Sequence, residues 1–224
     1  GVDDTNNAYD SAFGAIDYLQ GGNGVDEYRV DWTEVDLRYS LEVYDADDLT
    51  AKPIKDRIVI IKDRYEAANF ELRLIPNRNY TFVVWADLVE EDSTADLHYN
   101  TANGLANITL NDTWVAMDET RDAFTVSSLI ENYTGQSIIN LELKRPFAKL
   151  RVKTIDLKDL TNLDITPAYA RVEYSTAYRA GFNALESKAF AAEDNVNKTH
   201  ATFPIAAYND NDENNMILFS DYFF

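Results

Sequence analysis

The stretch Val35-Asp-Leu-Arg-Tyr-Ser-Leu-Glu-Val43 alternates apolar and polar residues at every position. Successive side chains of a β-strand point to opposite faces, so this pattern gathers the apolar residues on one side. A helical period would instead place Arg38 and Glu42 on the apolar face. The stretch therefore predicts a β-strand with one face in the core and the other in water.

Similar two-residue periods recur along the chain. Residues 70–74 alternate apolar with charged side chains, turn residues follow at 76–79, and a second run covers 80–86. We interpret the two runs as a hairpin. Because the second run is apolar at both parities, we expect it to be covered on both faces. Further strands are predicted at 57–62, 108–116, 138–154, 169–176 and 215–224.

The apolar set changes parity within 138–154. Residues 139, 141 and 143 are apolar, but after Pro146 the apolar residues are Ala148, Leu150 and Val152. A single straight strand would turn one of these sets away from the core. We therefore predict one extra residue, a bulge or a bend near Arg145 and Pro146, where a proline is tolerated. Helical turns are predicted only around 64–69, 121–130 and 156–162.

Many short strands with few helices indicate an all-β antiparallel sandwich. A chain of 224 residues can bury about 70% of its surface, enough for a core without staples. Residues 1–24 are acidic, contain no Lys or Arg and end in Gly21, Gly22 and Gly24, so we interpret them as a flexible N-terminal arm. Residues 25–224 form the predicted sandwich domain. Because 216–224 is apolar to its end, we expect this strand to lead into a further segment of a longer protein.

The charge of the chain narrows the classes of partner. The formal net charge is -19, from 20 basic and 39 acidic side chains. Such a field repels phosphate backbones and anionic lipid headgroups, so we expect no nucleic acid partner. No apolar run reaches the length of a membrane helix. The absence of cysteine excludes disulfides and thiol chemistry.

Candidate catalytic and metal-binding residues are few. Histidine occurs only at His98 and His200, and we interpret both as surface loop residues, because nothing near them supplies a triad. The acidic run 210–221 imitates a calcium loop in spacing but has Asn215 where that loop needs glycine. We therefore expect no catalytic residue, no metal and no cofactor, and hence no enzyme.

Two sets of residues are candidates for binding. Lys149, Arg151 and Lys153 share one parity. They form either the wet face of an antiparallel strand or a basic stripe that contacts the acidic surface of another subunit. Trp32 and Trp114 could stack on sugar rings, which makes a surface glycan-binding module the alternative function, although buried tryptophan is the commoner case in a sandwich.

Several segments, taken together, are familiar: Leu72–Tyr80 running into Phe82–Asp87, then Arg121–Phe124, Arg145–Val152 and Asp221–Phe224. In this order they resemble the fimbrillin-like surface proteins of Bacteroidales bacteria, which include the major and minor subunits of their fimbriae. The resemblance covers residues 28–224. It implies a transthyretin-like β-sandwich of Greek-key topology, followed by a second sandwich domain in a longer protein, and a non-enzymatic structural or adhesion role.

The resemblance also implies how such a protein reaches its place. Family members are exported as lipoproteins to the cell surface and anchored through a lipidated cysteine, which would lie upstream of Gly1. Pilus subunits lose their first strand to an arginine-specific protease, for which Arg29 and Arg38 are the first available positions. A strand donated by another fimbrial subunit, or by a second copy, then fills the gap. An adhesion protein of this kind could also bind a surface glycan or protein of a host or bacterium.

Overall fold

The computed structural model describes residues 30–63, 68–111, 118–135, 138–154, 156–165, 169–173, 181–190, 200–204 and 216–223. Every strand pairing within these ranges is antiparallel. The described elements are β1 (Val35–Asp45), β2 (Lys55–Lys62), β3 (Tyr80–Glu90), β4 (Tyr99–Asn100), β5 (Ile108–Leu110), η2 (Glu119–Arg121), β6 (Ala123–Ile130), β7 (Ala148–Thr154), α3 (Leu157–Asn162), β8 (Tyr169–Glu173), β9 (Gly181–Asn183), β10 (Lys188–Phe190), β11 (His200–Pro204) and β12 (Met216–Phe223). The predicted all-β antiparallel sandwich is confirmed, whereas its transthyretin-like, Greek-key topology stays a prediction.

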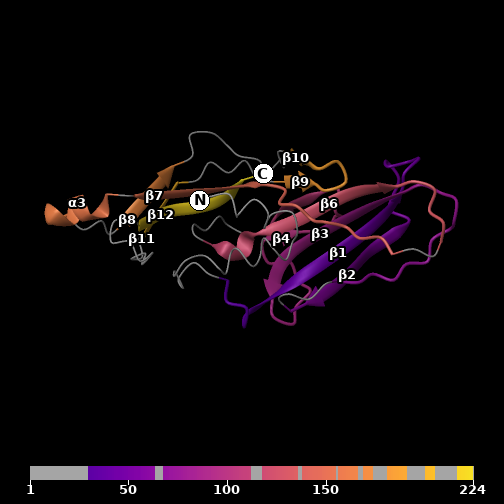
Figure 1. Cartoon of the computed structure of the whole chain (residues 1–224), viewed down its shortest axis with the longest axis horizontal. Helices are drawn as coiled ribbons and strands as arrows, with labels where there is room; N and C mark the ends of the chain where they lie inside the picture. The colour runs from indigo at the N-terminus through magenta and orange to yellow at the C-terminus, as the bar shows by residue number, and fades with distance from the viewer. Residues whose placement is uncertain are drawn as a thin grey trace.

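Two four-stranded sheets form the body of the protein (Figure 1). Their strand orders are β2-β1-β3-β6 and β10-β9-β5-β4. Two further pairs, β7 with β12 and β8 with β11, form ribbons that extend from the body toward α3 at the far end of the molecule. The predicted arm, residues 1–24, lies outside the described residues.

The sheet β2-β1-β3-β6 is covered on both faces by different layers. On one face, Trp85 of β3 is fully buried and packs on Phe182 of the second sheet, with ring centroids 6.1 Å apart. On the other face, Leu41 of β1 belongs to a core that includes side chains from the extended segments 68–74 and 138–143. The prediction that the second hairpin run is covered on both faces is therefore confirmed for β3.

The prediction that β1 has one face in water is wrong. Asp36, Arg38, Ser40 and Glu42 are only 6%, 1%, 0% and 3% exposed. Glu42 on this face accepts a hydrogen bond from the backbone N–H of Leu105 at 3.1 Å, whereas the Ser40 hydroxyl is buried without a hydrogen-bond partner. Alternation in the sequence shows which side chains share a face, but it does not show that a second layer covers that face.

Most predicted strands lie where the sequence places them. Strands β2, β3, β8 and β12 match the predictions at 57–62, 80–86, 169–176 and 215–224, β5 lies within 108–116, and the helical turn at 156–162 is confirmed as α3. The helical turn predicted at 121–130 is wrong, because η2 ends at Arg121 and β6 follows. β6 pairs with β3 from Ala123 to Ile130, so pairing with a buried strand outweighs the weak local preference of its residues.

The predicted hairpin is half right. Residues 68–75 approach β3 through the turn but form no ladder with it, and β3 pairs with β1 and β6 instead. The segment is extended and its apolar side chains reach the core, yet it lies in a separate layer. An alternating pattern fixes which side chains point inward and leaves open which edge, if any, the backbone joins.

The predicted break near Arg145 and Pro146 is confirmed. Residues 138–143 belong to no strand, Lys144 forms an isolated bridge with Thr125, and β7 begins at Ala148.

The orientation expected after the break is wrong, because Leu150 and Val152 are 46% and 42% exposed. Ala148 is exposed as well, whereas Lys149 faces inward.

Candidate functional site

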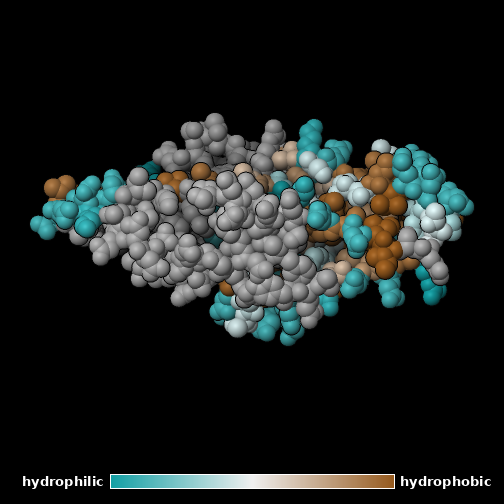
Figure 2. All heavy atoms as spheres, viewed as in Figure 1, coloured by the Kyte–Doolittle hydropathy of each residue, from teal (hydrophilic) through white to brown (hydrophobic). Residues whose placement is uncertain are grey.

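An apolar groove lies on one face of the sheet β2-β1-β3-β6. It runs between the extended segments 68–74 and 138–143, which we call its two walls. Its volume is about 540 Å³, within the range of about 300–1,000 Å³ typical of ligand sites. The floor is formed by Tyr39, Leu41, Phe82 and Val84, and the walls contribute Phe70, Leu72, Leu74, Ile139, Leu141 and Leu143. Figure 2 shows hydrophobic residues at the surface of the body, at the end away from α3.

The walls have the form of two strand edges without a partner. Among the described residues, no backbone–backbone hydrogen bond involves residues 68–74 or 138–143. The ladder from β6 ends at Thr125 and Lys144, which exchange hydrogen bonds of 2.8 and 2.9 Å. Because backbone groups alternate in direction along a strand, those of Leu141 point away from β6. Such groups are normally paired in native proteins, so a β-strand placed between the walls would find partners on both sides.

The alternation in both walls predicts ordinary ladders: a hairpin that contains Phe70, Leu72 and Leu74, and a long strand that contains Ile139 and Leu141. Only the missing backbone bonds reveal the groove, and one sequence carries no direct signal for them.

Lys149 does not lie on the wet face of its strand. Its ammonium group donates to Glu119 Oε2 and lies 5.1 Å from the ring centroid of Tyr222. Glu119 also accepts a hydrogen bond from the Tyr222 hydroxyl at 2.8 Å. Because Glu119 neutralises the Lys149 charge within the chain, Lys149 is a poor candidate for the predicted subunit-contact stripe. For Arg151 and Lys153, whose backbones lie in β7, the stripe stays a prediction.

A second buried ion pair lies beside the first. Arg145 donates through Nε and Nη2 to both carboxylate oxygens of Asp122, at 2.7 and 2.5 Å. Burial raises the pKa of Asp122, and the Arg145 guanidinium opposes that effect. Together with the Glu119 contacts, this pair fastens β7 and β12 to the body of the protein.

Of the two candidate glycan-stacking residues, only Trp32 belongs to the described part of the chain. Trp32 is half-buried and packs against two core clusters, which leaves less of its ring free for a sugar. Trp114 lies outside the described residues. The glycan-binding alternative therefore stays a prediction with no support from the position of Trp32.

The interpretation of His98 as a surface residue is wrong. His98 is 5% exposed, and its Nε2 lies 2.6 Å from Thr120 Oγ1. The Thr120 hydroxyl donates to Asp118 Oδ1 at 2.5 Å, so Nε2 is the donor in the His98 contact. In this order of donors, His98 stabilises the η2 turn, and its Nε2 does not act as a proton acceptor for the Thr120 hydroxyl. His200 lies in β11.

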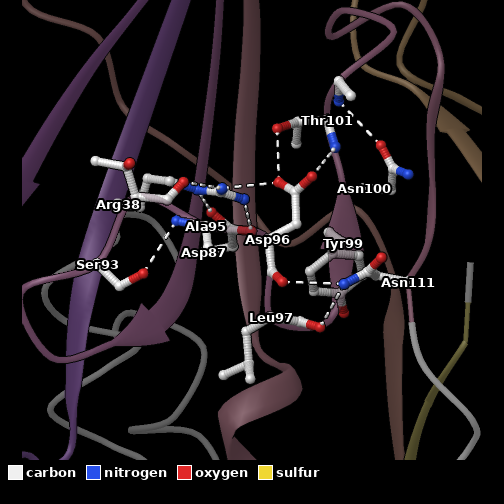
Figure 3. Close-up of polar contacts among 12 residues, drawn as sticks. Arg38, Asp87, Ser93, Ala95, Asp96, Leu97, Tyr99, Asn100, Thr101 and Asn111 are labelled. Atoms are coloured by element: carbon white, nitrogen blue, oxygen red, sulfur yellow. Dashed lines mark hydrogen bonds and ion pairs between the residues drawn. The ribbon is translucent and has the colours of Figure 1, made fainter.

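The most extensive polar network on β1 is also structural (Figure 3). Arg38 donates to both carboxylate oxygens of Asp87, to Asp96 Oδ1 at 2.8 Å and to the Thr94 carbonyl at 3.0 Å. Asp96 in turn accepts from the Thr101 hydroxyl at 2.9 Å. The network ties the loop that follows β3 to the sheet, and it places Arg38 out of reach of a protease in the folded chain. Arg29 lies outside the described residues.

The described residues offer neither a metal site nor a membrane-spanning helix. In the described part of the chain, no group of three or more His, Asp or Glu side chains is placed to hold a metal ion. Nor do the described residues include a helix long and apolar enough to cross a membrane.

Comparison with known proteins identifies a family, but no match among curated proteins or solved structures. No curated protein matches the sequence, and no solved structure matches the fold. One family model does match, over residues 11–224, and its description states that the function is unknown. Because this match covers nearly the whole sequence, the chain belongs to the family of unknown function DUF6562.

Proposed function

We propose that this chain is a non-enzymatic structural or adhesion protein of the bacterial cell surface, a fimbrial subunit or fimbrillin-like lipoprotein, that assembles by β-strand donation. Its partner is another fimbrial subunit or a second copy of the chain. The membrane is reached only through a lipid anchor upstream of this sequence.

The observation that carries the proposal is the groove with two unpaired walls. Strand addition uses main-chain hydrogen bonds for affinity and alternate side chains for specificity. The walls supply the first through the backbone groups of 68–74 and 138–143, which have no backbone hydrogen-bond partner among the described residues. The floor residues Tyr39, Leu41 and Phe82 supply an apolar surface for the second.

The composition supports the same proposal. With 39 acidic side chains against 20 basic ones, the chain repels its own copies at long range. A backbone-mediated contact tolerates that repulsion better than a contact between charged faces, because it needs no complementary charges.

The test is the state of assembly of the full-length protein before and after treatment with an arginine-specific protease. Size-exclusion chromatography and electron microscopy should show polymers whose length grows with concentration. A product that stays strictly monomeric under both conditions would count against the proposal.

A matched pair of variants locates the contact. Leu141→Arg places a charge in one wall of the groove and should abolish assembly. Leu163→Arg adds the same charge at a side chain that is 69% exposed beyond α3, away from the groove, and should leave assembly unchanged. Equal loss in both variants would mean that net charge, and not the groove, controls assembly.

A further inference from the structure

The two walls of the groove are joined at one end by the turns beside them. Asn77 N–H donates to the Tyr133 carbonyl at 2.7 Å, and Tyr133 N–H donates to the Arg78 carbonyl at 2.9 Å. Asn132 N–H adds a bond to Asn79 Oδ1 at 2.9 Å. At this end, hydrogen bonds between turns therefore join the segment after the first wall to the segment before the second wall.

Two buried tyrosines hold these turns in shape. The Tyr80 hydroxyl accepts from Ile75 N–H at 3.1 Å and donates to the Ile75 carbonyl at 2.8 Å. It thus occupies both backbone groups of the residue that follows the first wall. The Tyr133 hydroxyl donates to the carbonyl of Gly135, which lies just before the second wall.

The two rings also contact each other. Their centroids are 5.8 Å apart at an interplanar angle of 77°, an edge-to-face arrangement favoured between aromatic rings. Tyr80 and Tyr133 are 2% and 9% exposed. Together they form one buried unit that links the end of one wall to the start of the other.

A link of this kind is needed because the second wall could otherwise pair with the edge of β6. The bridge between Thr125 and Lys144 sets an antiparallel register. Extended along the chain, it would place Glu142 opposite Ser127 and Asn140 opposite Leu129. The wall could then pair with the edge of β6, with a net gain for each hydrogen bond made, and the groove would lose that side.

We infer that Tyr80 and Tyr133 are positioning residues that hold the two walls apart and so keep the groove open for an incoming strand. This inference rests on the proposed function for its purpose, but the spacing of the walls can be measured without it. Losing the Tyr133 hydroxyl removes one hydrogen bond and losing the Tyr80 hydroxyl removes two, so each loss should shift the equilibrium constant between open and closed groove by at least about fivefold.

The test measures the distance between the walls directly. The chain has no cysteine, so Glu71→Cys and Glu142→Cys, at exposed wall positions, accept a pair of spin labels. Distances are compared among the otherwise unaltered chain, Tyr80→Phe and Tyr133→Phe. The control is Tyr99→Phe, which removes a buried hydroxyl that donates to the Arg121 carbonyl, away from the groove.

The expected result is one narrow distance distribution for the unaltered chain and Tyr99→Phe, and a second population in both Tyr80→Phe and Tyr133→Phe. The rate of polymer growth in those two variants should fall in proportion to the loss of the open population. An unchanged distribution in both would overturn the inference, even if the chain polymerises. A shifted distribution in a chain that never polymerises would uphold the positioning role and reject the proposed function.

Discussion

Arg38 and Asp87 are direct partners across strands β1 and β3, and the guanidinium Nε and Nη2 donate to the two carboxylate oxygens at 2.9 and 2.6 Å. The side chains are 1% and 0% exposed. Charges this deeply buried are costly unless paired, and removing one partner leaves the other uncompensated.

Replacing one partner of this pair should therefore cost more than replacing both. We expect Arg38→Met to lower the free energy of unfolding by about 3–5 kcal/mol. The double variant Arg38→Met/Asp87→Leu should lose much less free energy of unfolding than the sum of the losses in Arg38→Met and Asp87→Leu. Urea unfolding of the four proteins gives the coupling energy, and strictly additive effects would show that the two side chains do not depend on each other.

Two buried tyrosines on β1 should respond in opposite directions to loss of the hydroxyl. The Tyr44 hydroxyl donates to Glu42 Oε2 at 2.6 Å, so Tyr44→Phe should lower the free energy of unfolding by about 1–2 kcal/mol. The Tyr39 hydroxyl is buried without a hydrogen-bond partner, so Tyr39→Phe should leave stability unchanged or raise it by about 1 kcal/mol. Urea unfolding at pH 7 decides, and a clear loss in Tyr39→Phe would contradict the assignment.

Two buried tyrosines, Tyr39 and Tyr222, predict how stability depends on alkaline pH. Burial raises the pKa of Tyr39, and it also raises the pKa of Tyr222 well above its usual range. The folded chain therefore keeps phenol protons that the unfolded chain releases above about pH 10. Stability should be complete below that pH and fall as pH rises beyond it. Urea unfolding at pH 8 and 11 measures the fall, which should be smaller in Tyr39→Phe.

Gly181 should not tolerate a side chain. A Cβ at this position would lie 2.4 Å from Cε2 of Phe190, the residue opposite it in the β9–β10 ladder. Gly181→Ala should lower the free energy of unfolding by about 1–3 kcal/mol, because the ring must leave its place. Phe190→Leu in the same chain should reduce this penalty, measured by thermal or urea unfolding; an equal penalty in both backgrounds would point to the backbone.

In β7, replacing the charged Lys149 should destabilise the protein more than replacing the apolar Leu150. Leu150 is 46% exposed, so Leu150→Ser should change the free energy of unfolding by less than about 0.5 kcal/mol. Lys149 pairs with the buried Glu119, so Lys149→Ala should cost about 3 kcal/mol. A larger loss of stability at Leu150 than at Lys149 in urea unfolding would instead support the orientation expected from the sequence, with Leu150 facing the core.

The sequence predicts which side chains of a strand share a face, but it does not predict which layers cover that face. Alternation at Val35–Val43 correctly placed a strand and its apolar face, because side-chain direction follows from local backbone geometry. It did not predict that Arg38 and Glu42 are buried. Covering that face requires the second sheet, which contains β4, β9 and β10 from distant parts of the chain.

The candidate site follows the same division. By itself the sequence determined the alternating apolar side chains of 68–74 and 138–143 and the break at Pro146, since these depend on residue order and on the chemistry of proline. Only the tertiary structure decided that both segments leave the ladder and face each other across a groove. Hydrogen bonds between strands join residues far apart in sequence, so their absence is visible only when the strands are placed in space.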